Sequence, residues 1–345
     1  MLGLILALLS PPLAATLDPG VQGAPFSIWA ARLEPPEVHP ERAQGWDFAA
    51  SLFQRVDALV QDKPGVIQAE LIGRSVERRP IWAFHVRDPG LPVERQVLVI
   101  AQLHSLEWIG AEVAVELLER LVEAPPRGLR VSVIVIANPD GRWRAEEDLL
   151  AGRVHSYRRA NAAGVDLNRD WSVNRESDVI WSKLPYSRRY YTSSPEALSQ
   201  PETQAIDALA QRMPPDAFVS LHAFGGYVEI PWGGVYEPTP DHARLMAMGR
   251  EMAEAMPNRP YRTIQLNHFV RWFRALGCEI DHFYEVYGAD AFLIELTRSG
   301  LRGPATWKDY FRWYNPVDKT EHVQDGTAAV QALVRMVETE VTLAE

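Results

Sequence analysis

Two histidines and two glutamates stand at the ends of short apolar runs or just beyond them. The runs cover residues 97–100, 218–221 and 292–294, and the polar residues are His104, Glu107, His222 and Glu295. Continuous apolar runs are typical of strands in a sheet covered on both faces. Because the carboxyl ends of neighbouring strands meet at one edge of such a sheet, we expect the four side chains to lie together. Two imidazoles and a carboxylate are ligands of catalytic zinc, and a second carboxylate can serve as its general base.

The spacing of His104 and Glu107 is a weak signal on its own. The same HxxE pattern recurs at His282 and Glu285, and such matches arise by chance in a chain of this composition. The first pattern follows a predicted buried strand and opens a helix, whereas no strand leads into the second. We therefore place the metal site at the first pattern.

A catalytic zinc site needs a third protein ligand, and His222 is the candidate. The alternative is that His222 is an ordinary core histidine, the commoner fate of a single histidine after an apolar run. Glu295 directly follows Phe-Leu-Ile. Burying an unpaired carboxylate there would be costly, so a nearby cation or a catalytic role is the better explanation.

The elements that position these residues follow from the hydrophobic pattern. Strands are predicted at 68–72, 81–86, 96–101 and 131–136, and a further strand ends at His222. Helices are predicted at 48–59, 108–122, 201–213 and 325–341, with a turn at 138–141 and surface loops over 171–201. Strands that alternate with helices predict a single α/β domain whose mixed, mostly parallel central sheet is flanked by helices.

Composition and the N-terminal residues narrow the function further. The net charge of -10, without a basic stripe, argues against nucleic-acid binding. Residues 1–15 resemble a signal peptide but are too short to span a membrane, so we expect a secreted or periplasmic protein. We expect residues 16–45 to be a Pro/Gly-rich leader or linker, too short for a folded inhibitory pro-domain, and 46–345 to be the catalytic domain. The single cysteine, Cys278, allows no intramolecular disulfide.

Several motifs together resemble the zinc carboxypeptidases of the carboxypeptidase A and B family. The resemblance extends from about Trp46 to Gly300 in order and approximate spacing. Its motifs are His-Ser-Leu-Glu-Trp-Ile at 104–109, Asn-Pro-Asp-Gly at 138–141, Gly-Val-Asp-Leu-Asn-Arg at 164–169, Ser-Leu-His at 220–222 with Tyr227 and Pro-Trp-Gly at 231–233, and Glu-Leu at 295–296 near Ser299 and Gly300.

This resemblance implies a role for each candidate residue. His104, Glu107 and His222 would hold one zinc ion per chain, and Glu295 would be the general base. The other implied roles are an oxyanion donor at Arg159, with Arg158 as the alternative, and a grip on the terminal carboxylate of the substrate at Asn168 and Arg169.

Two departures from the family pattern affect the substrate contacts. Leu106 stands where the mammalian digestive members have arginine, and Phe273 stands where the family has a tyrosine that closes over the terminal carboxylate. The same alignment puts Ile280 at the position that reads the last side chain, which would favour apolar or aromatic termini. A shift by one residue, to Glu279 or Asp281, would favour lysine or arginine.

The sequence thus predicts a zinc metallocarboxypeptidase that removes C-terminal residues from peptide substrates. One alternative is a zinc amidase acting on N-acyl amino acids or cell-wall peptides with the same metal ligands. A second alternative is a catalytically silent binding module of the same fold.

Overall fold

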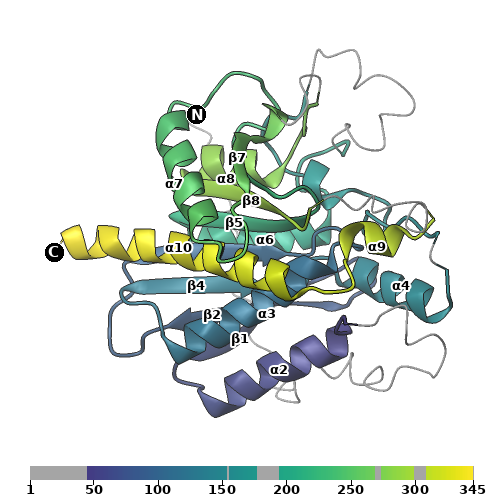
Figure 1. Cartoon of the computed structure of the whole chain (residues 1–345), viewed down its shortest axis with the longest axis horizontal. Coiled ribbons are helices and arrows are strands. Elements are labelled where there is room, and N and C mark those ends of the chain that lie inside the picture. The colour runs from purple at the N-terminus through teal and green to yellow at the C-terminus, as the bar shows by residue number, and fades with distance from the viewer. Residues whose placement is uncertain (1–44, 154, 177–193, 269–272, 299–307, 345) are drawn as a thin grey trace, which may run out of the picture.

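A mixed sheet of eight strands forms the centre of the described part of the molecule (Figure 1). This computed structural model describes residues 45–153, 155–176, 194–268, 273–298 and 308–344. The strand order is β1-β2-β4-β3-β5-β8-β6-β7. The strands are β1 (Ile67–Arg74), β2 (Pro80–Arg87), β3 (Arg95–Ala101), β4 (Leu129–Ile134), β5 (Ala217–Ala223), β6 (Tyr227–Ile230), β7 (Arg262–Gln265) and β8 (Asp290–Leu296).

Parallel pairing dominates the middle of the sheet. β3 pairs in parallel with β4 and with β5, and β5 pairs in parallel with β8. The pairings β1–β2, β2–β4 and β6–β8 are antiparallel, and β6–β7 is parallel. The predicted fold class is therefore confirmed.

Helices cover both faces of this sheet. The hydrophobic cluster on one face takes residues from α2 (Ala49–Asp62), α3 (Trp108–Glu123), α7 (His242–Glu254) and α10 (Thr320–Ala344). The cluster on the other face takes residues from α6 (Pro201–Arg212) and α8 (Glu279–Tyr287). Figure 1 shows the long C-terminal helix α10 lying across the sheet beside α3 and α7. Among the described residues, no helix is both long and apolar enough to cross a membrane.

Strand β3 shows why its sequence lacks polar alternation. Val97 and Val99 pack into the first cluster, whereas Leu98 and Ile100 pack into the second. Successive strand side chains point to opposite faces. Since both faces of β3 are covered, every side chain from Val97 to Ala101 is buried.

One local prediction, the turn at 138–141, needs correction. Residues 138–141 begin helix α4 (Pro139–Leu150), because the Asn138 side chain caps it by accepting from Gly141 N at 2.9 Å. Helix α6 begins at Pro201 as expected, with Gln200 as its N-cap residue. The second HxxE pattern lies within helix α8. The proposed signal peptide, nearly all of the leader, and Ser299 and Gly300 lie outside the described residues.

Candidate metal centre and active site

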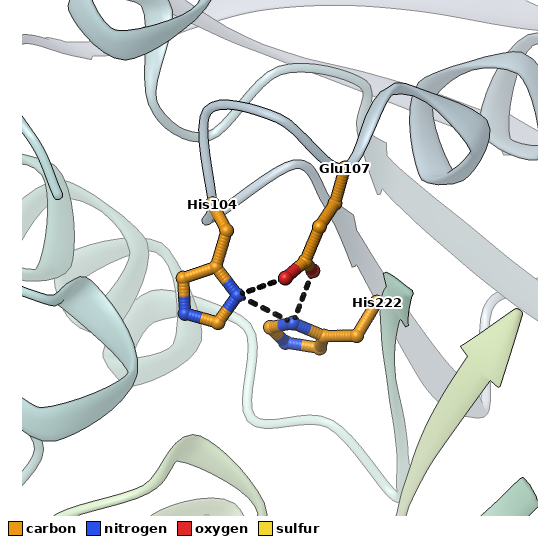
Figure 2. A group of neighbouring side chains, drawn as sticks. All are labelled: His104, Glu107 and His222. Atoms are coloured by element: carbon orange, nitrogen blue, oxygen red, sulfur yellow. Dashed lines mark hydrogen bonds and ion pairs between the residues drawn. The ribbon is translucent and has the colours of Figure 1, made fainter. Parts of the chain in front are cut away.

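His104, Glu107 and His222 point toward one another at the carboxyl edge of the sheet (Figure 2). Glu107 Oε1 lies 2.8 Å from His104 Nδ1, and Glu107 Oε2 lies 2.9 Å from His222 Nδ1. The two Nδ1 atoms are 3.0 Å apart, and all three residues are buried. One ligand atom from each residue lies within 4.8 Å of the others, so the three are positioned to hold a single metal ion.

The outer nitrogen of each imidazole meets a carboxylate. His104 Nε2 lies 2.9 Å from Asp166 Oδ1, and His222 Nε2 lies 2.8 Å from Glu279 Oε1. A carboxylate partner places the imidazole proton on the outer nitrogen. We infer that the inner Nδ1 lone pairs converge with the Glu107 carboxylate on one point. This donor set fits a divalent cation such as zinc.

The electrostatics of the pair His222 and Glu107 also favour a cation. Burial alone lowers the pKa of His222, but Glu279 and Glu107 outweigh it and hold that pKa well above the usual value. Burial raises the pKa of Glu107, yet the two histidines more than reverse this and leave its pKa far below the ordinary range. The site therefore stabilises positive charge beside an ionised carboxylate.

Each ligand owes its place to a particular element. His104 lies in the loop after β3, Glu107 is the N-cap residue of α3, and His222 lies on β5. Helix α3 can approach β5 closely because of Gly110, where a Cβ atom would lie 2.8 Å from the Leu221 carbonyl oxygen. A larger residue there would push the helix, and Glu107 with it, away from His222.

Glu295 faces a cavity of about 130 Å³ that opens onto the metal ligands. It lies on β8 directly opposite His222 in the parallel β5–β8 pairing. Its Oε2 atom is buried without a hydrogen-bond partner among the described residues. Burial, followed by the nearby Glu107, raises the pKa of Glu295 to about 8. A carboxyl with a raised pKa next to a metal site is suited to accepting and returning a proton.

Arg159, and not Arg158, reaches this cavity. Arg159 Nε donates to Asp166 Oδ2 at 2.6 Å, and its Nη1 lies 3.6 Å from Glu107 Oε1. Arg158 pairs with Asp148, with its Nη2 3.2 Å from Asp148 Oδ1. The guanidinium that lies beside the metal ligands is therefore that of Arg159.

Asn168 and Arg169 line the same cavity from the short helix η3 (Leu167–Arg169). Both are buried, and the Asn168 side-chain oxygen accepts from Glu279 N at 3.2 Å. The Asp166 side chain caps this turn by accepting from Asn168 N. The Asp166 carboxylate thus orients the His104 ring and also caps the turn that carries Asn168 and Arg169.

The family model for zinc carboxypeptidases matches residues 52–311, about three quarters of the chain. The chain belongs to the zinc carboxypeptidase family. Carboxypeptidase A4 of Mus musculus is 23% identical over 283 residues, covering 76% of this chain and 66% of the relative. The chain thus spans just under two thirds of that relative's length.

Solved structures agree on the fold. The crystal structure of thrombin activatable fibrinolysis inhibitor has a TM-score of 0.70 at 18% identity, covering 86% of this chain and 75% of that one. Carboxypeptidase A from Helicoverpa armigera has a TM-score of 0.66 at 21% identity, covering 93% of this chain and 80% of that one.

The two residues predicted to contact the substrate's last residue, Phe273 and Ile280, lie in different places in this zinc carboxypeptidase fold. Phe273 lines the cavity, whereas Ile280 is fully buried in the hydrophobic cluster beneath the sheet and is absent from the cavity wall. Its neighbours are also engaged, because Glu279 contacts His222 and Asp281 accepts from Gly233 N at 2.7 Å and Gly234 N at 2.9 Å. The geometry therefore does not support Ile280, or either neighbour, as a reader of the last side chain.

Sequence reasoning missed the positions of three acidic residues around the site, Asp166, Glu279 and Glu229, although it named Glu279 as a possible substrate contact. Asp166 was already inside a matching motif, so its contact with His104 could have been suspected. Glu279 could be recognised only after α8 had been placed against β5. Glu229 lines the cavity from β6. The only feature of the sequence that could have indicated this is a glutamate within the otherwise apolar or aromatic run Tyr-Val-Glu-Ile.

Proposed function

We propose that this chain is a zinc-dependent carboxypeptidase that removes C-terminal residues from peptides. The observation that supports this proposal is a single cavity lined by Glu295, by Arg159, Asn168 and Arg169, and by the two histidines of the three-ligand group. A silent binding module would need no buried carboxyl with a raised pKa in that place.

The residues divide the reaction between them. When bound, zinc would polarise a water molecule and the scissile carbonyl. Glu295 takes the proton from the attacking water and passes it to the leaving amine. The Arg159 guanidinium faces the oxygen on which negative charge develops, and such stabilisation is often the largest single contribution to rate.

Asn168 and Arg169 restrict cleavage to the last peptide bond, because they bind the terminal carboxylate of the substrate. A planar guanidinium suits a carboxylate because it can donate two parallel hydrogen bonds. Anchoring the substrate's terminal carboxylate on Arg169 would place the last peptide bond near Glu295 and the metal ligands. Export from the cell, argued from residues 1–15, belongs to the same proposal.

The decisive experiment incubates the zinc-loaded protein with matched peptides that have free or amidated C-termini, and identifies the released residues by mass spectrometry. We expect release from free termini alone. Glu295→Gln should lower kcat by about 10² to 10⁴ and retain about one zinc per chain. Arg169→Ala should selectively lower kcat/KM for free termini.

Three results would contradict the proposal. They are equal cleavage of free and amidated peptides, near-normal turnover by Glu295→Gln, and cleavage of muropeptides or N-acyl amino acids without release from peptides. The last result would establish the amidase alternative.

A further inference from the structure

Glu229 is a buried acidic residue to which the proposed mechanism gives no task. It lies on β6, is 5% exposed, and lines the cavity that contains Glu295. Its carboxylate has no hydrogen-bond or ion-pair partner among the described residues. Three other acids around the metal ligands differ, because Glu107, Asp166 and Glu279 each contact an imidazole.

The strand pairing explains why the Glu229 side chain faces the cavity. In the antiparallel β6–β8 pair, Glu229 lies opposite Leu293 and Tyr227 lies opposite Glu295. Directly opposed residues point to the same face of a sheet, and so do residues two apart on one strand. All four residues line the cavity. Glu229 lies opposite Leu293, two positions before the proposed base Glu295 on β8.

The cavity also has a distribution of charge that suits a particular substrate. Asn168 and Arg169 provide polar groups for a terminal carboxylate, whereas Glu229 provides a separate carboxylate. Apolar side chains line the same cavity, Leu266, Ala275 and Leu293 among them. A residue with both a terminal carboxylate and a cationic side chain would satisfy these groups together, with its aliphatic stem on the apolar wall.

Leaving Glu229 unpaired is unfavourable. Burial, followed by the nearby Glu295, raises the pKa of Glu229 well above its usual value. A cation in contact would favour the ionised form, whereas an apolar side chain would leave a buried polar group without a partner. The same residue therefore attracts a basic side chain and disfavours an apolar one.

We propose that Glu229 reads the last side chain of the substrate and selects lysine or arginine. This inference rests on the proposed carboxypeptidase function and names its substrate class. It replaces Ile280, which the fold buries, as the specificity residue.

The test compares kcat/KM for blocked peptides that differ only in a final arginine, lysine, leucine or phenylalanine. The wild-type protein should prefer the basic residues by at least tenfold. Glu229→Gln should reduce the arginine-to-leucine ratio by about 10- to 100-fold, the range expected for one hydrogen bond to a charged group. The matched control is Glu285→Gln, the same change at an exposed position on α8, which should leave the ratio unchanged.

Two kinetic results would overturn the inference. One is a wild-type preference for apolar termini, which needs no variant to observe. The other is an equal change of all four substrates in Glu229→Gln together with a shifted pH profile, which would mean that Glu229 only tunes Glu295.

A binding measurement separates this inference from the proposed function. Free arginine and leucine are titrated calorimetrically into the zinc-loaded wild-type protein and Glu229→Gln. If no peptide is cleaved but arginine binds only when Glu229 is present, the carboxypeptidase proposal fails and the cation-selective pocket stands. If both amino acids bind equally well to the wild-type protein, the pocket assignment fails.

Discussion

At the scale of single residues, the carboxylates behind the metal ligands matter as much as the ligands. Asp166 and Glu279 contact the outer nitrogens of His104 and His222. These contacts fix the ring orientation and leave the inner nitrogens available to a metal ion. Glu279 performs this task from helix α8, far from His222 in the sequence.

Glu279→Gln should therefore weaken zinc binding by about 10- to 100-fold, because it removes the charge that supports the His222 imidazole. Competition with a chromophoric zinc chelator measures the change. Glu285→Gln, on the exposed side of the same helix, should bind zinc like the wild type. An unchanged affinity in Glu279→Gln would show that the carboxylate does not support the ligand.

At the scale of elements, α8 joins the active site to the core. Its first residue contacts His222, while Ile280 and Phe283 pack into the cluster beneath the sheet, where the Phe283 ring stacks on Phe218 with centroids 3.8 Å apart. His282 connects α8 to α6 through Asp207 Oδ1 at 3.0 Å, and to the loop after η3 through Ser172 Oγ at 2.8 Å. The second HxxE histidine is thus a structural residue.

His282→Ala should lower the free energy of unfolding by about 1 to 3 kcal/mol, since it leaves a polar partner unsatisfied, while zinc content stays at the wild-type level. Urea unfolding and metal analysis measure the two quantities. Its HxxE partner provides the control, because Glu285→Ala at an exposed site should change stability by less than about 0.5 kcal/mol. Loss of zinc from His282→Ala would mean that the metal site was placed at the wrong motif.

At the scale of the whole molecule, the metal ligands join parts of the chain that are distant in sequence. His104 and His222 are 118 residues apart; His104 follows β3, and His222 lies on the neighbouring strand β5. Without a metal ion, the site brings together two imidazoles and several carboxylates in a buried space. Any cation that binds the folded form alone stabilises that form by mass action.

Removing zinc with a chelator should therefore lower Tm, and adding zinc back should restore it. At a free zinc concentration 100 times the Kd, the expected stabilisation is about 2.7 kcal/mol. Differential scanning calorimetry measures the shift. The response should persist in His282→Ala and disappear in His222→Ala. If neither the chelator nor added zinc changes the Tm of the wild-type protein, the assignment of a metal site is contradicted.

The sequence alone determined the class of fold and the place of the metal site. The runs at 97–100 and 218–221 identified two buried strands, because a strand covered on both faces is largely apolar. His104, Glu107, His222 and Glu295 could then be brought together, because parallel strands end at one edge of the sheet. The strand assignment also separated the first HxxE pattern from the second.

The tertiary structure decided which residues act around that centre. Ile280 and Glu279 are adjacent in sequence, yet one is buried in the core and the other contacts His222. Only the docking of α8 against β5 and β8 sets this division, because the rotation of a helix depends on what it packs against. Glu229 likewise reaches the cavity through the antiparallel pairing of β6 with β8, a long-range contact that no local pattern in residues 227–230 specifies.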